Sequence, residues 1–190
     1  MSVRVLAGRE RGRRLEVPGG RTRPTSSLVR GVVFDMLAHR DWLAGRVVLD
    51  LFAGSGALGI EALSRGAASV VFVDESTAAV RVLRRNLARS DGLVHRARVV
   101  ALPVERGLRR LAAEGFVADG VLADPPYGRG LAGRTVARIA SSGVLAEGGW
   151  LAVEHPAEEI VPAPDGFADV VRRRHGGTSV TLLVREETAS

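Results

Sequence analysis

The sequence predicts an α/β fold built on a doubly wound, mostly parallel sheet of seven strands. From Arg46 onward, short β-branched runs alternate with helical stretches, which is typical of parallel strands joined by right-handed crossovers. The runs that precede the last two are mainly apolar, as expected for strands that helices cover on both faces. The last two runs flank His175-Gly176-Gly177 with no room for a helix, so they predict a C-terminal antiparallel hairpin.

The predicted elements follow in order from these patterns. Val3, Val5 and Ala7 alternate with polar residues, which predicts a small N-terminal β-hairpin; Thr25 is a candidate N-cap for a helix that runs to about His39. The predicted strands are 47–51, 69–73, 97–100, 121–123, 150–153, 170–174 and 179–184. The predicted helices of the core are 57–65, 77–89, 104–113 and 131–141.

Length and composition set the class of protein. A chain of 190 residues fits one compact domain with a small appendage, and 46% hydrophobic with 25% charged residues is typical of a globular protein. No apolar run is long enough for a membrane span, and no signal peptide is recognisable, so we expect a cytoplasmic protein without a membrane partner. Nothing in the sequence indicates an obligate dimer, so we expect a monomer.

The sequence excludes several kinds of chemistry. It has no cysteine, which rules out disulfides, thiolate zinc sites and cysteine nucleophiles. The four histidines are scattered without the spacing of metal ligands, so we expect no metal.

The positive charge is concentrated at the N-terminus. Residues 1–30 contain eight arginines against Glu10 and Glu16, whereas residues 31–190 contain nineteen arginines and nineteen acids. This asymmetry indicates a surface that binds a polyanion, although a solvated tail is the alternative. We therefore divide the chain into a basic, polyanion-binding extension at 1–40 and a core domain at 41–190.

A glycine loop follows the first core strand. Gly54, Gly56 and Gly59 fit the spacing G-x-G-x-x-G, and Asp74 lies twenty residues after Gly54, where a carboxylate could accept hydrogen bonds from a ribose. By itself this element also fits an NAD-dependent oxidoreductase or a purely structural turn. Asp50, directly before the loop, favours a cofactor with an ammonium and a sulfonium group, S-adenosylmethionine, because a carboxylate opposes a pyrophosphate.

Asp124-Pro125-Pro126-Tyr127 directly follows the fourth core strand. In a doubly wound sheet the first and fourth strands are neighbours, so this tetrapeptide and the glycine loop should share a crevice. An Asp124 carboxylate and a Pro125 carbonyl could accept both hydrogens of a nucleobase amine and make its nitrogen nucleophilic. The prolines fix the carbonyl, and Tyr127 offers a face for stacking a base. Without cysteine, methylation at a pyrimidine carbon is disfavoured, so an amine remains the acceptor.

These residues resemble the RsmD-type bacterial 16S rRNA guanine-N2 methyltransferases, a family with the class I, Rossmann-like methyltransferase fold. The resemblance covers nearly the whole chain, and the arginine-rich N-terminus narrows it to this family. It rests on these residues: Val5 to Gly8, Arg11 to Leu15, Pro18, Arg23 to Thr25, Arg30, Phe34, Asp50 to Ala67, Asn86-Leu87, Asp124 to Tyr127, Glu154-His155 and Gly176 to Thr178.

The resemblance implies S-adenosylmethionine as methyl donor and the N2 amine of a guanine in 16S rRNA as acceptor, guanine 966 in the family, in RNA or in the small ribosomal subunit. Asp124, Pro125, Pro126 and Tyr127 would hold the target base. The implied cofactor residues are Asp50, Ala53, Gly54, Ser55, Gly56, Asp74, Glu75 and Val104, whose N–H would replace an acid missing after the third strand. The implied RNA-binding residues are Arg11, Arg13, Arg14, Arg23 and Arg30.

Three alternatives stay open at this stage. A DNA adenine-N6 methyltransferase uses the same tetrapeptide, but this short chain offers no separate target-recognition domain. An NAD-dependent oxidoreductase fits the glycine spacing alone. A non-catalytic RNA-binding or assembly factor would keep the fold without turnover.

Overall fold

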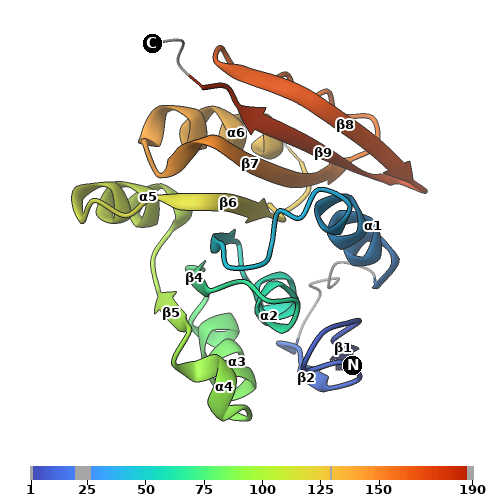
Figure 1. The fold of residues 1–190 in the computed structure, drawn as a ribbon, viewed down its shortest axis with the longest axis vertical. Helices are drawn as coiled ribbons and strands as arrows, with labels where there is room; N and C mark the ends of the chain where they lie inside the picture. Colours follow the sequence, from blue (N-terminus) through green and yellow to red (C-terminus); the bar gives the residue numbers. More distant parts are fainter. Residues whose placement is uncertain (1, 20–26, 129, 188–190) are drawn as a thin grey trace.

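The computed structural model describes residues 2–19, 27–128 and 130–187. Its main sheet has seven strands in the order β5-β4-β3-β6-β7-β9-β8 (Figure 1). The pairs among β5, β4, β3, β6 and β7 are parallel, and β9 is antiparallel to both β7 and β8. The strands are β3 (Val47–Leu51), β4 (Ser69–Val73), β5 (Ala97–Val100), β6 (Ala118–Ala123), β7 (Leu145–Pro156), β8 (Phe167–His175) and β9 (Thr178–Arg185). The predicted doubly wound fold with its C-terminal hairpin is confirmed.

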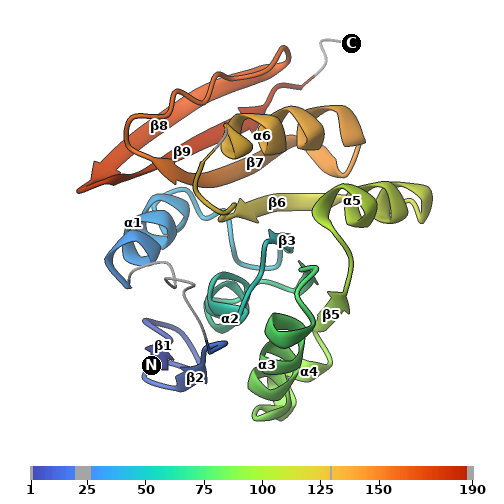
Figure 2. The same cartoon turned by 180° about the vertical axis from the view of Figure 1, so that it is seen from behind.

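Helices cover both faces of the sheet because neighbouring strand residues point to opposite sides. In β3, Val48 joins an apolar core beneath one group of helices, whereas Leu49 and Leu51 join a second core beneath the other group. Figures 1 and 2 show the two helical layers on either side of the sheet. The first layer contains α1 (Ser27–Ala38), α2 (Ala57–Ser64), α3 (Thr77–Ala88) and α4 (Asp91–Val94), and the second contains α5 (Val104–Ala113) and α6 (Leu131–Ser142).

The N-terminal residues form a separate two-stranded sheet of β1 (Ser2–Arg4) and β2 (Arg14–Glu16), in which Val3 pairs with Leu15 (Figure 2). We call residues 2–19 the N-terminal hairpin. The buried Glu61 carboxylate of α2 accepts the backbone N–H groups of Leu6 at 2.7 Å and Ala7 at 3.0 Å. Buried backbone donors need such partners, so these bonds fix the hairpin to the core.

Gly8 allows the closest approach between the N-terminal hairpin and α2. Its φ is +81°, and an added Cβ would lie 2.0 Å from the carbonyl oxygen of Ser64. The Ser64 hydroxyl donates to the carbonyl of Ala7, and the N–H of Arg9 donates to the carbonyl of Ser64 at 2.9 Å. Only glycine fits here without strain.

Some boundaries differ from the sequence prediction. β7 begins five residues before the predicted 150–153 run, because its first half contains Gly148 and Gly149 and lacks an apolar pattern. The short helix α4 was not predicted, since four residues show no helical periodicity. The expected N-cap Thr25 lies outside the described residues. The division at 40/41 stays a prediction, although α1 packs within the core of the main sheet.

Within the described ranges, no helix is both long enough and apolar enough to span a bilayer.

Candidate active site

The glycine loop between β3 and α2 has a tight backbone. Phe52, Gly54 and Gly56 all have positive φ, of 58°, 55° and 82°. A Cβ on Gly56 would lie 2.3 Å from Leu83, so Gly56 is required for packing. A Cβ on Gly54 would meet only the Phe52 carbonyl oxygen, at 3.9 Å, so Gly54 faces open space that a ligand can approach. A non-glycine residue at positive φ is strained, and such strain is concentrated at functional sites.

Asp50 lies beneath this loop and is fully buried. Its Oδ2 accepts the N–H of Gly59 at 2.9 Å, while its Oδ1 has no hydrogen-bond partner among the described residues. Burial, and then the nearby charges of Asp124 and Asp74, raise the pKa of Asp50 to about 8. Three carboxyl groups therefore meet at the ends of β3, β4 and β6, an arrangement that favours a cationic ligand.

Asp74, at the end of β4, supports the loop from the other side. Its Oδ2 accepts the N–H of Gly54 at 2.8 Å and its Oδ1 accepts the N–H of Ser76 at 2.8 Å. Glu75 follows it and is exposed, and Val104 begins α5 just beyond the end of β5. These residues lie at the carboxyl ends of adjacent parallel strands, where ligands bind in open α/β sheets.

The tetrapeptide Asp124 to Tyr127 follows β6, the neighbour of β3. The backbone N–H of Asp124 donates to the carbonyl of Leu51, 3.5 Å away, which places the tetrapeptide beside the start of the glycine loop. Pro125 is buried, whereas Pro126 and Tyr127 are exposed. The two segments thus form one corner at the edge of the sheet.

Tyr127 is fixed at its hydroxyl end while its ring stays accessible. The side chain is 55% exposed, yet its hydroxyl donates to Glu154 Oε1 at 3.0 Å and lies 2.5 Å from Thr178 Oγ1. Desolvation, together with the neighbouring Glu154 and Asp124 charges, raises the pKa of Tyr127 to about 12, so the phenol stays neutral. A held, exposed ring can stack on a planar ligand.

Glu154 and Thr178 were not among the predicted site residues. Glu154 is a mostly buried acid on β7, and Thr178 begins β9. A signal for Glu154 was present, because an acid directly after the apolar run 150–153 needs a buried partner.

Four of the five predicted RNA-binding arginines fall into three groups. Arg11 and Arg14 are exposed on the N-terminal hairpin, and Arg23 lies outside the described residues. The Arg13 guanidinium is mostly covered, because it donates to Glu10 Oε2 at 2.6 Å and to the carbonyl of Asn86 at 2.6 Å.

The prediction that Arg30 faces RNA is wrong. Arg30 is 1% exposed and donates to the carbonyl of Arg4 at 2.9 Å. Burial lowers its pKa, and the Glu61 charge opposes that shift. Arg30 shares a helical face with the buried Phe34 and Leu37, at spacings of four and seven, so its side chain points into the protein, where the Arg4 carbonyl of the N-terminal hairpin accepts its hydrogen bond.

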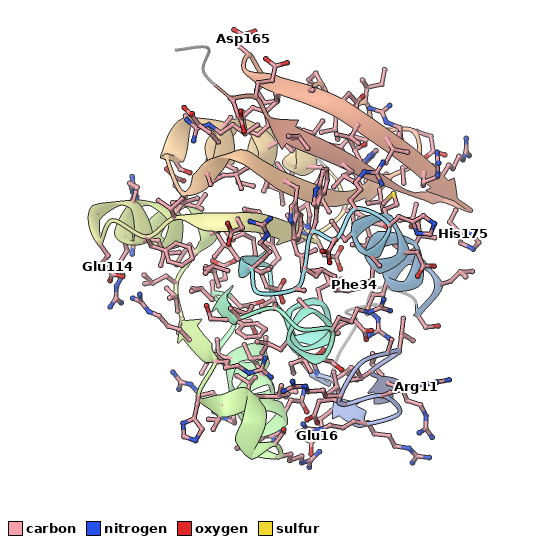
Figure 3. The ribbon with its side chains drawn as sticks, viewed as in Figure 1. Arg11, Glu16, Phe34, Glu114, Asp165 and His175 are labelled. Atoms are coloured by element: carbon pink, nitrogen blue, oxygen red, sulfur yellow. The ribbon has the colours of Figure 1, made fainter. Side chains whose placement is uncertain are left out.

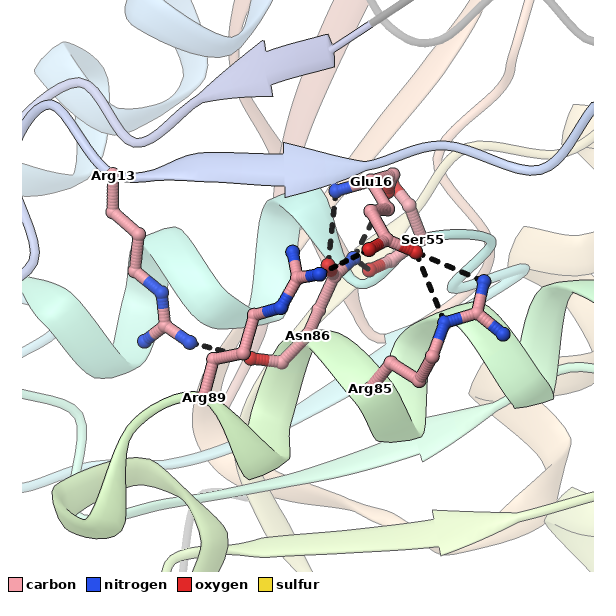
Figure 4. Close-up of polar contacts among 6 residues, drawn as sticks. All are labelled: Arg13, Glu16, Ser55, Arg85, Asn86 and Arg89. Atoms are coloured by element: carbon pink, nitrogen blue, oxygen red, sulfur yellow. Dashed lines mark hydrogen bonds and ion pairs between the residues drawn. The ribbon is translucent and has the colours of Figure 1, made fainter.

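Asn86 connects the N-terminal hairpin to the glycine loop (Figure 4). Its Nδ2 donates to the carbonyls of Glu16 and Ser55, both at 2.9 Å, and its Oδ1 accepts the N–H of Glu16 at 2.9 Å. The Glu16 carboxylate pairs with Arg85 on the surface of α3 and with Arg89, the residue directly after that helix. One buried amide therefore satisfies groups from two segments that are far apart in the chain.

Comparison with known proteins places this chain in a family. The family model described as "Conserved hypothetical protein 95" matches residues 3–184. "Ribosomal RNA small subunit methyltransferase D" of Escherichia coli (strain K12) is 35% identical over 190 residues, which cover 97% of this chain and 90% of that protein. The chain belongs to the RsmD-type methyltransferase family.

Two further matches align with this chain over nearly the full length of both proteins. "Putative rRNA methyltransferase YlbH" of Bacillus subtilis is 36% identical over 95% of this chain and 97% of its own length. The solved structure of "Putative methyltransferase yhhF" from Escherichia coli superposes with a TM-score of 0.83 at 34% identity, covering 99% of this chain and 100% of the other. The RsmD-type resemblance and the methyltransferase fold expected from the sequence are both confirmed.

Proposed function

We propose that this protein is an rRNA methyltransferase that transfers the methyl group of S-adenosylmethionine to the N2 amine of a guanine in 16S rRNA. One observation carries the proposal: the glycine loop after β3 and the Asp124–Tyr127 tetrapeptide after β6 adjoin at neighbouring strand ends. A donor bound on the loop and a base held at the tetrapeptide would then be in contact. Guanine 966, the family's target, is the nucleotide we propose.

The cofactor assignment is supported by the charge and shape of the loop. The buried Asp50 Oδ1 lacks a partner among the described residues, and Asp74 adds negative charge beside it. These carboxylates suit an ammonium and a sulfonium and oppose the pyrophosphate of NAD. Asp74 would accept the ribose hydroxyls, with Glu75 beside it, while Ala53, Gly54, Ser55 and Gly56 would contact the cofactor through the loop and the Val104 N–H would meet its adenine. When bound, S-adenosylmethionine supplies an electrophilic methyl group.

The acceptor assignment follows from the chemistry of the tetrapeptide. The Asp124 carboxylate and the Pro125 carbonyl would each accept one hydrogen of the guanine N2 amine, which directs the nitrogen lone pair outward. Proline fixes φ near −65°, so the carbonyl is oriented before the base arrives. The Tyr127 ring would stack on the base, with its hydroxyl held by Glu154 and Thr178. In-line positioning then supplies much of the rate enhancement.

The RNA assignment is supported by the exposed Arg11 and Arg14 of the N-terminal hairpin and by the relatives named as rRNA methyltransferases. These cations would bind phosphates without reading sequence. We propose that the protein acts as a monomer in the cytoplasm and uses no metal.

The test is transfer of labelled methyl groups to unmethylated 16S rRNA or small-subunit particles, followed by nucleoside analysis. We expect N2-methylguanosine from the wild type. Asp124→Ala should lower the transfer rate by at least about 10²–10³-fold while its affinity for S-adenosylmethionine, measured by calorimetry, stays within a few-fold. The matched control is Asp165→Ala, a surface acid far from the site (Figure 3).

Three outcomes would contradict the proposal. Methylated adenine would indicate an adenine-N6 methyltransferase. Binding of NAD but not of S-adenosylmethionine would indicate an oxidoreductase. RNA binding without turnover in the wild type would indicate an assembly factor.

A further inference from the structure

The turn between β8 and β9 carries positive charge beside the candidate active site. Arg172, Arg173, Arg174 and His175 are consecutive and exposed, and Gly176 and Gly177 complete the turn. We call Arg173 to Thr178 the β8–β9 turn. β8 is the last strand of the sheet, and no strand within the described ranges pairs with its outer edge.

This turn is tied directly to Tyr127. Thr178, the first residue of β9, lies 2.5 Å from the Tyr127 hydroxyl, and the Gly177 carbonyl accepts the N–H of Ala157 at 3.0 Å. In the β8–β9 ladder His175 is opposite Thr178, and Arg173 is opposite Val180. Directly opposed residues point to the same face of a sheet, so Arg173 and His175 lie on the face that carries the Tyr127 contact.

The arginines of β8 differ in the hydrogen bonds and ion pairs that they form within the protein. Arg172 donates to Thr181 Oγ1 and to the Val161 carbonyl, both at 3.1 Å, so its role is structural. Arg173 donates to the Arg172 carbonyl at 3.4 Å and forms no ion pair with any acid that the structure describes. Arg174 pairs with Glu158 at 3.7 Å, but the two side chains are 66% and 77% exposed, and such pairs contribute little.

The turn and the N-terminal hairpin lie on the same side of the molecule. In Figure 3, His175 and Arg11 project from this side, with α1 and its Phe34 between them. Two basic surfaces, the N-terminal hairpin and the β8–β9 turn, thus lie on either side of α1. The candidate active site is next to the β8–β9 turn. A folded RNA is wide enough to contact both, since its phosphates extend well beyond the target base.

We propose that Arg173, on the Tyr127 face of the β8–β9 turn, binds a backbone phosphate of the substrate RNA beside the target base. Arg174 is opposite Ser179 and lies on the other face of the same edge strand, where it adds a second phosphate contact as the RNA passes that edge. This inference rests on the proposed function, because it takes RNA as the substrate. The β8–β9 turn contacts phosphates next to the base that stacks on Tyr127. The N-terminal hairpin binds a more distant part of the same RNA.

The test is the salt dependence of binding to an unmethylated 16S rRNA transcript. The double variant Arg173→Ala/Arg174→Ala should bind more weakly at low salt, and the slope of log K against log[salt] should fall by about 0.7–0.9 for each lost phosphate contact. The control variant Arg109→Ala/Arg110→Ala removes two exposed arginines from α5, at the far side of the sheet, and should keep the wild-type slope. Arg173→Lys/Arg174→Lys retains the charge and should restore binding.

The outcomes separate this inference from the proposed function. Equal slopes for wild type and the Arg173→Ala/Arg174→Ala variant, with methylation intact, would overturn the role of the turn and leave the proposed function standing. A reduced slope in the Arg173→Ala/Arg174→Ala variant, together with a wild type that binds RNA but transfers no methyl group, would support the role of the turn and refute the proposed function. Unchanged affinity for S-adenosylmethionine and an unchanged melting temperature show that each variant is folded. The single variant Arg173→Glu serves if the double variant is unstable, and it should weaken RNA binding more than Arg173→Ala.

Discussion

The side-chain amide of Asn86 holds the glycine loop through a 2.9 Å hydrogen bond to the carbonyl of Ser55. The same amide binds both backbone groups of Glu16 in the N-terminal hairpin. Because Asn86 is fully buried, removing it leaves polar groups of two segments without partners. The loop that we assign to the cofactor and the segment that we assign to RNA are therefore joined through one residue.

We expect Asn86→Ala to lower the free energy of unfolding by about 2–4 kcal/mol, since an unsatisfied buried polar group costs about 1–3 kcal/mol. It should also weaken binding of S-adenosylmethionine, because the Ser55 backbone is released. Urea unfolding and calorimetry measure the two effects. Arg89→Ala is the control: it removes only an exposed ion pair with Glu16 and should cost less than about 1 kcal/mol. Equal losses in the two variants would contradict the assignment.

Glu61→Gln should loosen the N-terminal hairpin without unfolding the core. The buried carboxylate binds the N–H groups of Leu6 and Ala7 and the Arg65 guanidinium, and breaking a buried pair costs about 3–5 kcal/mol. We expect trypsin to cleave the arginines of residues 4–14 roughly 100-fold faster. Glu105→Gln, on the surface of α5, should leave the cleavage rate unchanged. Cleavage at the wild-type rate in Glu61→Gln would show that other contacts fix the hairpin.

Stability should depend on pH through Asp50. Its pKa is raised from 3.8 to about 8 in the folded protein, so the folded state binds a proton that the unfolded state releases. The contribution of Asp50 to stability is complete below about pH 4 and is lost as the pH rises toward 8, with a slope of at most about 1.4 kcal/mol per pH unit. Unfolding of wild type and Asp50→Asn across this range measures it. The variant should show a flatter profile, and a steeper one would contradict the assignment.

Tyr127→Phe should keep the ring but lose its two polar contacts. We expect kcat/KM for methyl transfer to fall about 10–100-fold, because a hydrogen bond to a charged group contributes about 1.5–3 kcal/mol. Cofactor affinity should not change. With the pKa of Tyr127 raised to about 12, the pH profile of the variant between pH 6 and 9 should have the wild-type shape. A new ionisation in that range would give the phenol a different role.

The parts of the fold that follow from local pattern were predictable. The strands 47–51, 69–73 and 97–100 have the predicted ends, because each is a short, mainly apolar run rich in β-branched residues that lies between helical patterns. The pairing of β3 with β6, which brings Asp124 to the glycine loop, followed from the strand order expected of a doubly wound sheet.

The contacts between distant segments were not predictable in the same way. The burial of Arg30 depends on the N-terminal hairpin folding over α1, and the anchoring of Tyr127 depends on residues 27 and 51 positions later in the chain. No local pattern encodes such pairings. A clue existed for Glu61, an acid within the apolar run 58–63 of α2, because a charge on a buried face must have partners.

The close approach of Gly8 to Ser64 limits how this protein could be recombined with its relatives. A chimera that transplants residues 2–19 onto another scaffold would keep its register only if position 8 is glycine and the host helix supplies the equivalents of Glu61 and Ser64. Any larger residue at position 8 would push the graft away from the helix. The hairpin and α2 are therefore expected to be inherited together, as one evolutionary unit.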